Sequence, residues 1–137
     1  MSNELMNLTN NADSNEFFTS CVPQTDDERM MLYKAMNAPD LKLADLINTE
    51  ISIRDYTLEK VKLSDEDGGE REAIRIGLIC VDGTTVSTIS NGVLRALRAL
   101  VAIYGAPTWE KGIKVKVQQV DRNGRRYFNL VPVFMGK

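Results

Sequence analysis

Cationic and aromatic side chains gather around a predicted hairpin, in the stretch GIKVKVQQVDRNGRRYFNLVPVF at residues 112–134. Its turn is Asn123-Gly124, a dipeptide that strongly favours a two-residue hairpin turn. Residues 108–137 carry seven basic and two acidic side chains, although the whole chain has a net charge of −2. Cations can follow a phosphate backbone and an aromatic face can stack on a base, so this composition is typical of a surface for single-stranded nucleic acid.

Two kinds of side chain are candidates for such binding. The predicted phosphate contacts are basic residues on two predicted hairpins: Lys60, Lys62, Arg71, Arg75, Lys114, Lys116, Arg122, Arg125 and Arg126. The predicted stacking residues are Tyr56, Trp109 and Tyr127. Plainer explanations stay open, because edge-strand lysines also guard against aggregation and each aromatic side chain could pack across strands. Arg95 and Arg98 are most simply the solvated side of a helix.

Enzymatic chemistry finds little support in the residue types. The chain has no histidine, which excludes most zinc sites and every histidine-based catalytic triad. The acidic turn SDEDGGE lacks the ligand spacing of a calcium loop. No glycine-rich phosphate loop joins a predicted strand to a helix. We therefore expect a protein that is not an enzyme and that uses no cofactor or metal.

Charge is divided unevenly along the chain and predicts its organisation. Residues 1–50 carry a net charge of −6, and residues 51–137 carry +4. We interpret 1–24 as an acidic segment that is disordered or loosely attached and dispensable for folding, and 25–137 as a single domain. Phe17-Phe18 is the exception in that segment, either a docking anchor or a small satellite of the core. Because the chain shows no signal peptide or apolar span, we expect a cytoplasmic protein that contacts no membrane and has two reduced cysteines.

Alternating and β-branched residues predict five strands after residue 50. The first, from Ile51 to Leu63, shifts the phase of its apolar residues, so a straight strand could not bury them on one face. We expect a long, bent strand with a β-bulge. The second and third strands are REAIRIGLICV and TTVST, joined by Asp82-Gly83. In the fourth, the apolar side chains Ile113, Val115 and Val117 alternate with Lys114, Lys116 and Gln118.

Two helices are predicted from capping residues and apolar periodicity. Thr25 can cap the first, with Glu28 completing a capping box and Pro39 ending it. Ser90 can cap the second, which Gly105 ends. Its apolar stripe comprises Val93, Leu94, Leu97, Leu100, Val101 and Tyr104. Residues 41–47 are ambiguous between a helical turn and an extended lead-in.

The order of these elements predicts a mainly β, α+β fold. A long bent first strand, two further strands, a helix and a final hairpin are the layout of the OB-fold, a five-stranded Greek-key barrel. The helix lies between the third and fourth strands, and an additional helix precedes the barrel.

The stretch STISNGVLRALRALVAIYGAPTWEKGIKVKVQQVDRNGRRYFNLVPV, preceded by LADLINTEISIRDY, resembles single-stranded DNA-binding proteins of bacteriophages and mobile elements, mainly of Gram-positive hosts. The resemblance covers roughly residues 41–134 and implies an OB-type fold that protects single strands during replication or recombination. It departs from the familiar bacterial single-strand binders at the C-terminus, because they end in an acidic partner-recruiting tail and this chain ends in FMGK.

The sequence thus predicts a non-catalytic protein that binds single-stranded DNA with little sequence preference. The alternative is a protein-interaction module that docks on a host replication or recombination enzyme, which the acidic N-terminal segment and Phe17-Phe18 favour. The predicted partners are single-stranded DNA and, less directly, replication or recombination proteins. An edge strand of this type could also pair with the same strand of a second copy, so a homodimer is a further alternative.

Overall fold

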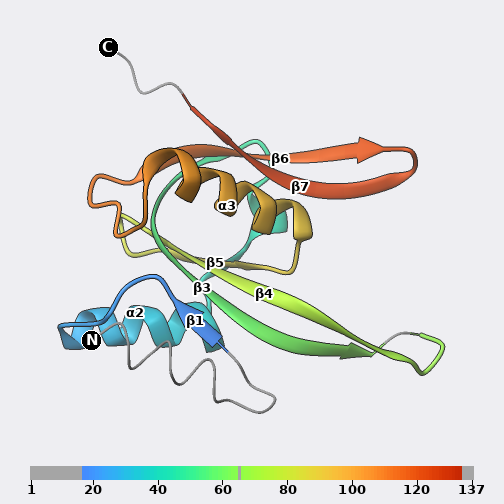
Figure 1. Ribbon diagram of the computed structural model, residues 1–137, viewed down its shortest axis with the longest axis horizontal. Coiled ribbons are helices and arrows are strands. Elements are labelled where there is room, and N and C mark those ends of the chain that lie inside the picture. The colour runs from blue at the N-terminus through green and yellow to red at the C-terminus, as the bar shows by residue number, and fades with distance from the viewer. Residues whose placement is uncertain (1–16, 65, 134–137) are drawn as a thin grey trace.

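The computed structural model describes residues 17–64 and 66–133, and it is mainly β with two α-helices (Figure 1). Its strands are β1 (Phe17–Thr19), β2 (Leu41–Lys42), β3 (Glu50–Ser64), β4 (Glu70–Cys80), β5 (Thr85–Thr88), β6 (Ile113–Arg122) and β7 (Arg125–Pro132). Its helices are α2 (Asp26–Asn37), the short 3₁₀ helix η1 (Leu43–Leu46) and α3 (Asn91–Tyr104).

All the described strands belong to one curled, mixed sheet. The strands follow the order β2-β5-β4-β3-β6-β7, and β1 pairs with β3 outside this path. The pair β2–β5 is parallel and the others are antiparallel. In Figure 1 the sheet curls through β3, and the β3–β4 and β6–β7 hairpins project toward the same side of the molecule.

Strand β3 owes its bend to a β-bulge, as its sequence predicts. The pairing of β3 with β4 shifts register between Ile53 and Asp55. Side chains on the two sides of the bulge can therefore reach the same core, which explains the first change of phase. The second change, between Leu58 and Val61, involves no bulge, because the pairing of β3 with β4 stays regular to Ser64. Val61 and Leu63 instead lie half-buried on the face opposite Leu58.

The core is enclosed by the curled sheet and α3. Its buried side chains include Ile53, Ile76, Leu78, Val86, Val93, Leu97, Val115, Val117 and Leu130. A smaller cluster of Leu32, Ala35 and Ile79 forms where α2 covers the other face of β4. Gly77 permits this close packing, because a Cβ there would clash with the Thr57 hydroxyl and lie 2.8 Å from the Ala35 carbonyl oxygen.

The helices begin at the predicted caps. The Thr25 hydroxyl accepts a hydrogen bond from the Glu28 N–H at 3.1 Å, and the Ser90 hydroxyl accepts one from the Val93 N–H at 3.3 Å. The Glu28 carboxylate accepts from the backbone N–H of Gln24 at 2.6 Å, one residue earlier than in a standard capping box. The predicted stripe of α3 is buried or half-buried up to Val101, whereas Tyr104 at the helix end is exposed.

Two short strands precede β3 in the chain. Residues 41–47 combine both alternatives, since β2 is extended and η1 follows it as a helical turn. Within the segment predicted to be disordered or loosely attached, Phe17–Thr19 forms β1, and the Phe18 ring lies 6.0 Å from the Tyr56 ring. Of the two alternatives for Phe17-Phe18, this contact agrees with a satellite of the core. The rest of that prediction, for residues 1–16, lies outside the described residues.

Candidate nucleic-acid interface

The β6–β7 hairpin has one buried face and one cationic face. Ile113, Val115 and Val117 are buried, as their alternation predicts. Directly paired residues share a face, and the pairs include Lys116 with Val131, Val120 with Tyr127, and Arg122 with Arg125. Five predicted binding residues therefore lie on the same outward face, which we call the cationic face: Lys114, Lys116, Arg122, Arg125 and Tyr127.

Beyond this face, a groove of about 720 Å³ opens between the hairpin tip and the start of α3. We call it the arginine groove, because its lining includes Arg95, Arg122, Arg125, Arg126 and Tyr127. Among the described residues that line it, none is acidic. The groove can therefore attract an anionic polymer although the whole chain is acidic.

The lining of the groove also includes Arg95, which the sequence did not predict as a binding residue. Arg95 is exposed on α3 and was explained as part of a solvated helix face. The structure places it across the groove from Arg122 and Arg125, whereas Arg98 does not line it. One sequence signal does exist, because residues 83–109 contain Arg95 and Arg98 but no acidic residue.

Ion pairs leave the arginine groove available to a ligand. Arg126 Nε lies 3.1 Å from Asp121 Oδ1, and both side chains are largely exposed. Exposed pairs of this kind contribute only about 0–1 kcal/mol, so a phosphate could replace the carboxylate. Lys114 Nζ and Glu50 Oε1 are 3.7 Å apart on the cationic face, in a pair that is also well exposed.

Close packing of α3 against β7 positions Tyr127. A Cβ at Gly92 would collide with the Phe128 carbonyl oxygen and lie 2.9 Å from Tyr127 Cδ2. Glycine at this position therefore allows the helix to contact the strand directly. Tyr127 is half-buried there and also lines the arginine groove. Its ring can pack against α3 and still offer surface to a base.

The four predicted cations of the β3–β4 hairpin do not share one face. Lys60 pairs with Ile74 and Lys62 with Glu72, whereas Leu63 pairs with Arg71 and Glu59 with Arg75. Lys60 and Lys62 thus project from the face opposite to that of Arg71 and Arg75. In addition, the Arg75 guanidinium donates to Glu59 Oε1 at 2.9 and 3.3 Å. One bound strand could therefore contact only two of these four cations on the same face of the β3–β4 hairpin.

The other two stacking candidates belong to an aromatic cluster. Trp109 is only 8% exposed, and its indole N–H donates to the Gly105 carbonyl oxygen at 2.9 Å. Its ring centroid is 6.5 Å from that of Tyr56, whose pKa is raised by burial. Packing, the alternative considered for both residues, is the role that these contacts describe. We therefore leave Trp109 and Tyr56 out of the proposed binding surface.

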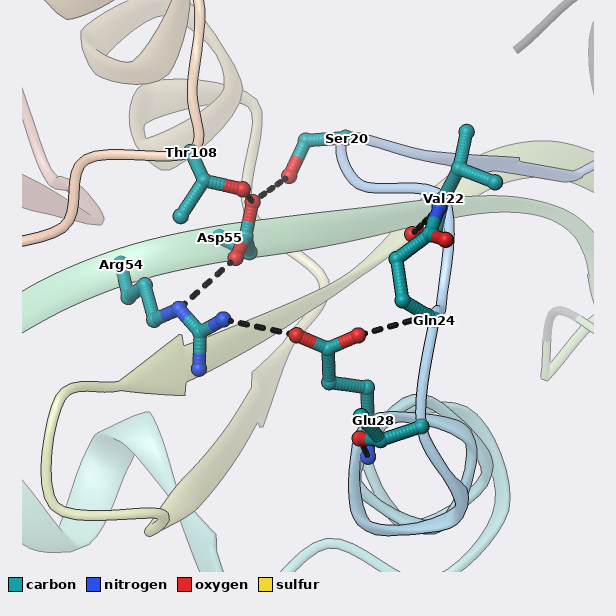
Figure 2. Close-up of polar contacts among 8 residues, drawn as sticks. Ser20, Val22, Gln24, Glu28, Arg54, Asp55 and Thr108 are labelled. Carbon is teal, nitrogen blue, oxygen red and sulfur yellow. Dashed lines mark hydrogen bonds and ion pairs between the residues drawn. The ribbon is translucent and has the colours of Figure 1, made fainter. Parts of the chain in front are cut away.

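A buried carboxylate at the bulge was missed by sequence reasoning (Figure 2). Asp55 is 1% exposed, and its Oδ1 accepts hydrogen bonds from the Ser20 and Thr108 hydroxyls at 2.8 and 2.9 Å. Arg54 Nε lies 3.4 Å from its Oδ2, and Arg54 also pairs with Glu28 at 3.2 Å. Burial raises the pKa of Asp55 despite these contacts.

These contacts give Asp55 a structural role. Ser20 precedes α2 and Thr108 lies in the loop before β6, and Arg54 links Asp55 to Glu28 on α2. The cluster therefore connects three segments that are distant in the sequence to β3. The only sequence signal is an aspartate in IRDY, at the point where the apolar phase shifts.

Within the part of the chain that the structure describes, no group of three or more His, Cys, Asp or Glu side chains could hold a metal ion. None of the described helices is long and apolar enough to cross a membrane.

The chain is thus a small β-rich protein with an open groove that four arginines line. Comparison with protein families matches residues 11–131 to the family described as Phage Single-stranded DNA-binding protein, Phi29_Phage_SSB. The match spans most of the chain, and the protein belongs to this family of single-stranded DNA-binding proteins. The comparisons with curated proteins and with solved structures give no match.

Proposed function

We propose that this protein coats single-stranded DNA with little sequence preference and without catalysis, using the cationic face and the arginine groove. The observation that carries the proposal is the lining of the arginine groove, in which four arginines and Tyr127 meet with no acidic residue among them. Arginines bind phosphates of any sequence, and an aromatic ring stacks on any base, so neither contact reads sequence.

We also infer that the curled sheet is an OB-like barrel. Five of its strands follow the path β5-β4-β3-β6-β7, with α3 between β5 and β6 in the chain. This order and the bulged, bent β3 are the features expected of a Greek-key barrel. We place the binding domain at residues 25–137, with β1 added to its sheet, and treat residues 1–16 as an acidic extension.

For the biological role we propose protection of single strands during phage DNA replication or recombination, in the cytoplasm of the host. Membership of a family of phage single-stranded DNA-binding proteins supports this role. Contacts with replication or recombination proteins would follow from it.

The proposal can be tested with two arginines of the same helix. Binding of a labelled oligo(dT) would be measured by fluorescence anisotropy at several salt concentrations. We expect Arg95→Ala to weaken binding and to flatten the plot of log affinity against log salt by up to about 0.7, the value for one phosphate contact on a single strand. Arg98→Ala is the matched control, because Arg98 is exposed on α3 but does not line the groove. Equal effects of the two changes would contradict the proposed groove.

A protein-interaction role is the second candidate, and one observation favours it. Met30 and Tyr33 on α2 are each 65% exposed, so this helix presents apolar surface that a partner protein could cover. Phe18 supports that role less than its sequence suggested, because its ring packs near Tyr56. A chain that binds no oligo(dT) at low salt, but retains a replication or recombination enzyme through α2, would favour this second candidate.

A further inference from the structure

A second groove, of about 320 Å³, runs between α3 and β7. Ala96, Ala99 and Ile103 line it from the helix, and Asn129 and Pro132 line it from the strand. Gly92, Arg95 and Tyr127 line both this groove and the arginine groove, so the two adjoin. Figure 1 shows α3 lying along the β6–β7 hairpin.

The chemistry of the α3–β7 groove suits unpaired bases. The small side chains of Ala96 and Ala99 contribute an apolar floor, and Ile103 is 76% exposed at the far end of the groove. None of the described residues that line it is acidic. The Asn129 side-chain oxygen accepts from the Leu130 N–H at 2.9 Å, and its side-chain NH₂ group is the part that can donate to a ligand. Such acceptors are present on every base edge.

Continuity with the arginine groove decides which occupant the α3–β7 groove takes. Arg95 stands where the grooves meet and can hold a phosphate there. A strand bound at the hairpin tip can therefore pass Arg95 and lay its following bases along α3. A protein segment would find an apolar floor as well, but would gain nothing from the arginine at the junction unless it were acidic.

We propose that the α3–β7 groove extends the DNA track, so that bases next to those held in the arginine groove lie against Ala96, Ala99 and Tyr127. This inference rests on the proposed function and adds to it the path of the strand and the length of DNA that one molecule contacts. Non-specific single-strand binders of this type contact roughly 4 to 16 nucleotides per OB-fold.

The test compares two alanines of the same helix. Ala99 lines the groove, Ala102 does not, and both are exposed on α3. Leucine is a good helix former and uncharged, so Ala99→Leu and Ala102→Leu should both fold and keep the charge of the protein. Equal melting temperatures would confirm this before binding is measured. Affinity would then be determined for oligo(dT) of increasing length, from roughly 4 to 16 nucleotides.

We expect the affinity of Ala99→Leu to match that of the unchanged protein for the shortest oligonucleotides and to be about tenfold weaker for the longest, because one or more bases lose their contact. Ala102→Leu should follow the unchanged protein at every length. Unchanged affinity of Ala99→Leu at all lengths would overturn the extended track, while an effect of Arg95→Ala would still support the proposed function. A change in sedimentation without a change in DNA affinity would assign the groove to a second copy of the chain and also overturn the proposal.

Discussion

Lys116 distinguishes the two explanations for the lysines of the cationic face. If it meets a phosphate, Lys116→Ala should weaken binding to all sequences alike and flatten the salt plot by up to about 0.7. If it only protects an edge, DNA affinity should stay unchanged and the variant should aggregate more readily. Anisotropy titrations at several salt concentrations measure the first effect and light scattering measures the second. Lys42→Ala, on the exposed surface of β2, is the control.

Tyr127 should contribute through its ring and not through charge. We expect Tyr127→Ala to lose about 1–3 kcal/mol of binding free energy, with a salt slope close to that of the unchanged protein. Because Tyr127 also packs beside Gly92, Tyr127→Leu is needed to separate stacking from packing. Leucine keeps apolar bulk against α3 but has no aromatic face. Recovery of full affinity in Tyr127→Leu would show that packing alone explains the loss.

At the scale of elements, β1 is the part whose removal is most informative. Deleting residues 1–20 removes β1 and the Ser20 hydroxyl, which donates to buried Asp55 and accepts from the Tyr56 N–H at 2.9 Å. Leaving such groups unsatisfied costs about 1–3 kcal/mol. We therefore expect a melting temperature lower by several degrees, at about 4 °C per kcal/mol for a domain of this size.

Deletion of residues 1–16 keeps β1 and serves as the comparison in the same thermal scans. We expect it to change the melting temperature by less than the longer deletion does. Equal losses from both deletions would show that β1 and Ser20 do not stabilise the domain. The sequence alone predicted that deletion of residues 1–20 would leave the melting temperature within a few degrees, and the contacts of Ser20 are the reason for expecting a larger loss.

Local signals explain which elements could be predicted from the sequence. Caps such as Thr25 and Ser90 act within four residues, and the bulge in β3 appears as a shift of apolar phase. Strands β1 and β2 have three and two residues, too few to show any alternation. The arginine groove was predicted only in part, because Arg95 reaches it through the packing of α3 on β7. The burial of Trp109 could not be read from the sequence for the same reason, since only the tertiary fold encloses its ring.

Over the whole molecule, basic side chains are concentrated in one part of the chain, although the net charge of the chain is negative. Residues 1–50 carry −6 and residues 51–137 carry +4, and the arginine groove belongs to the basic part. Both long hairpins project toward the same side, which places the tip of β6–β7 and that of β3–β4 near one end of the molecule (Figure 1). An extended strand can follow such a surface, whereas the acidic total should limit non-specific attraction to other polyanions.

The preference for single-stranded over duplex DNA should therefore grow with salt concentration. A duplex keeps its bases stacked inside, so it can offer this surface only phosphates, whereas a single strand also stacks on Tyr127. Each phosphate contact contributes a salt slope of about 0.9 on duplex DNA and about 0.7 on a single strand, so duplex binding weakens faster as salt rises. Competition between labelled oligo(dT) and an unlabelled duplex of equal length, at low and moderate salt, measures the preference directly. A preference that shrinks with added salt, or equal affinity at both concentrations, would contradict a binding surface built on stacking as well as charge.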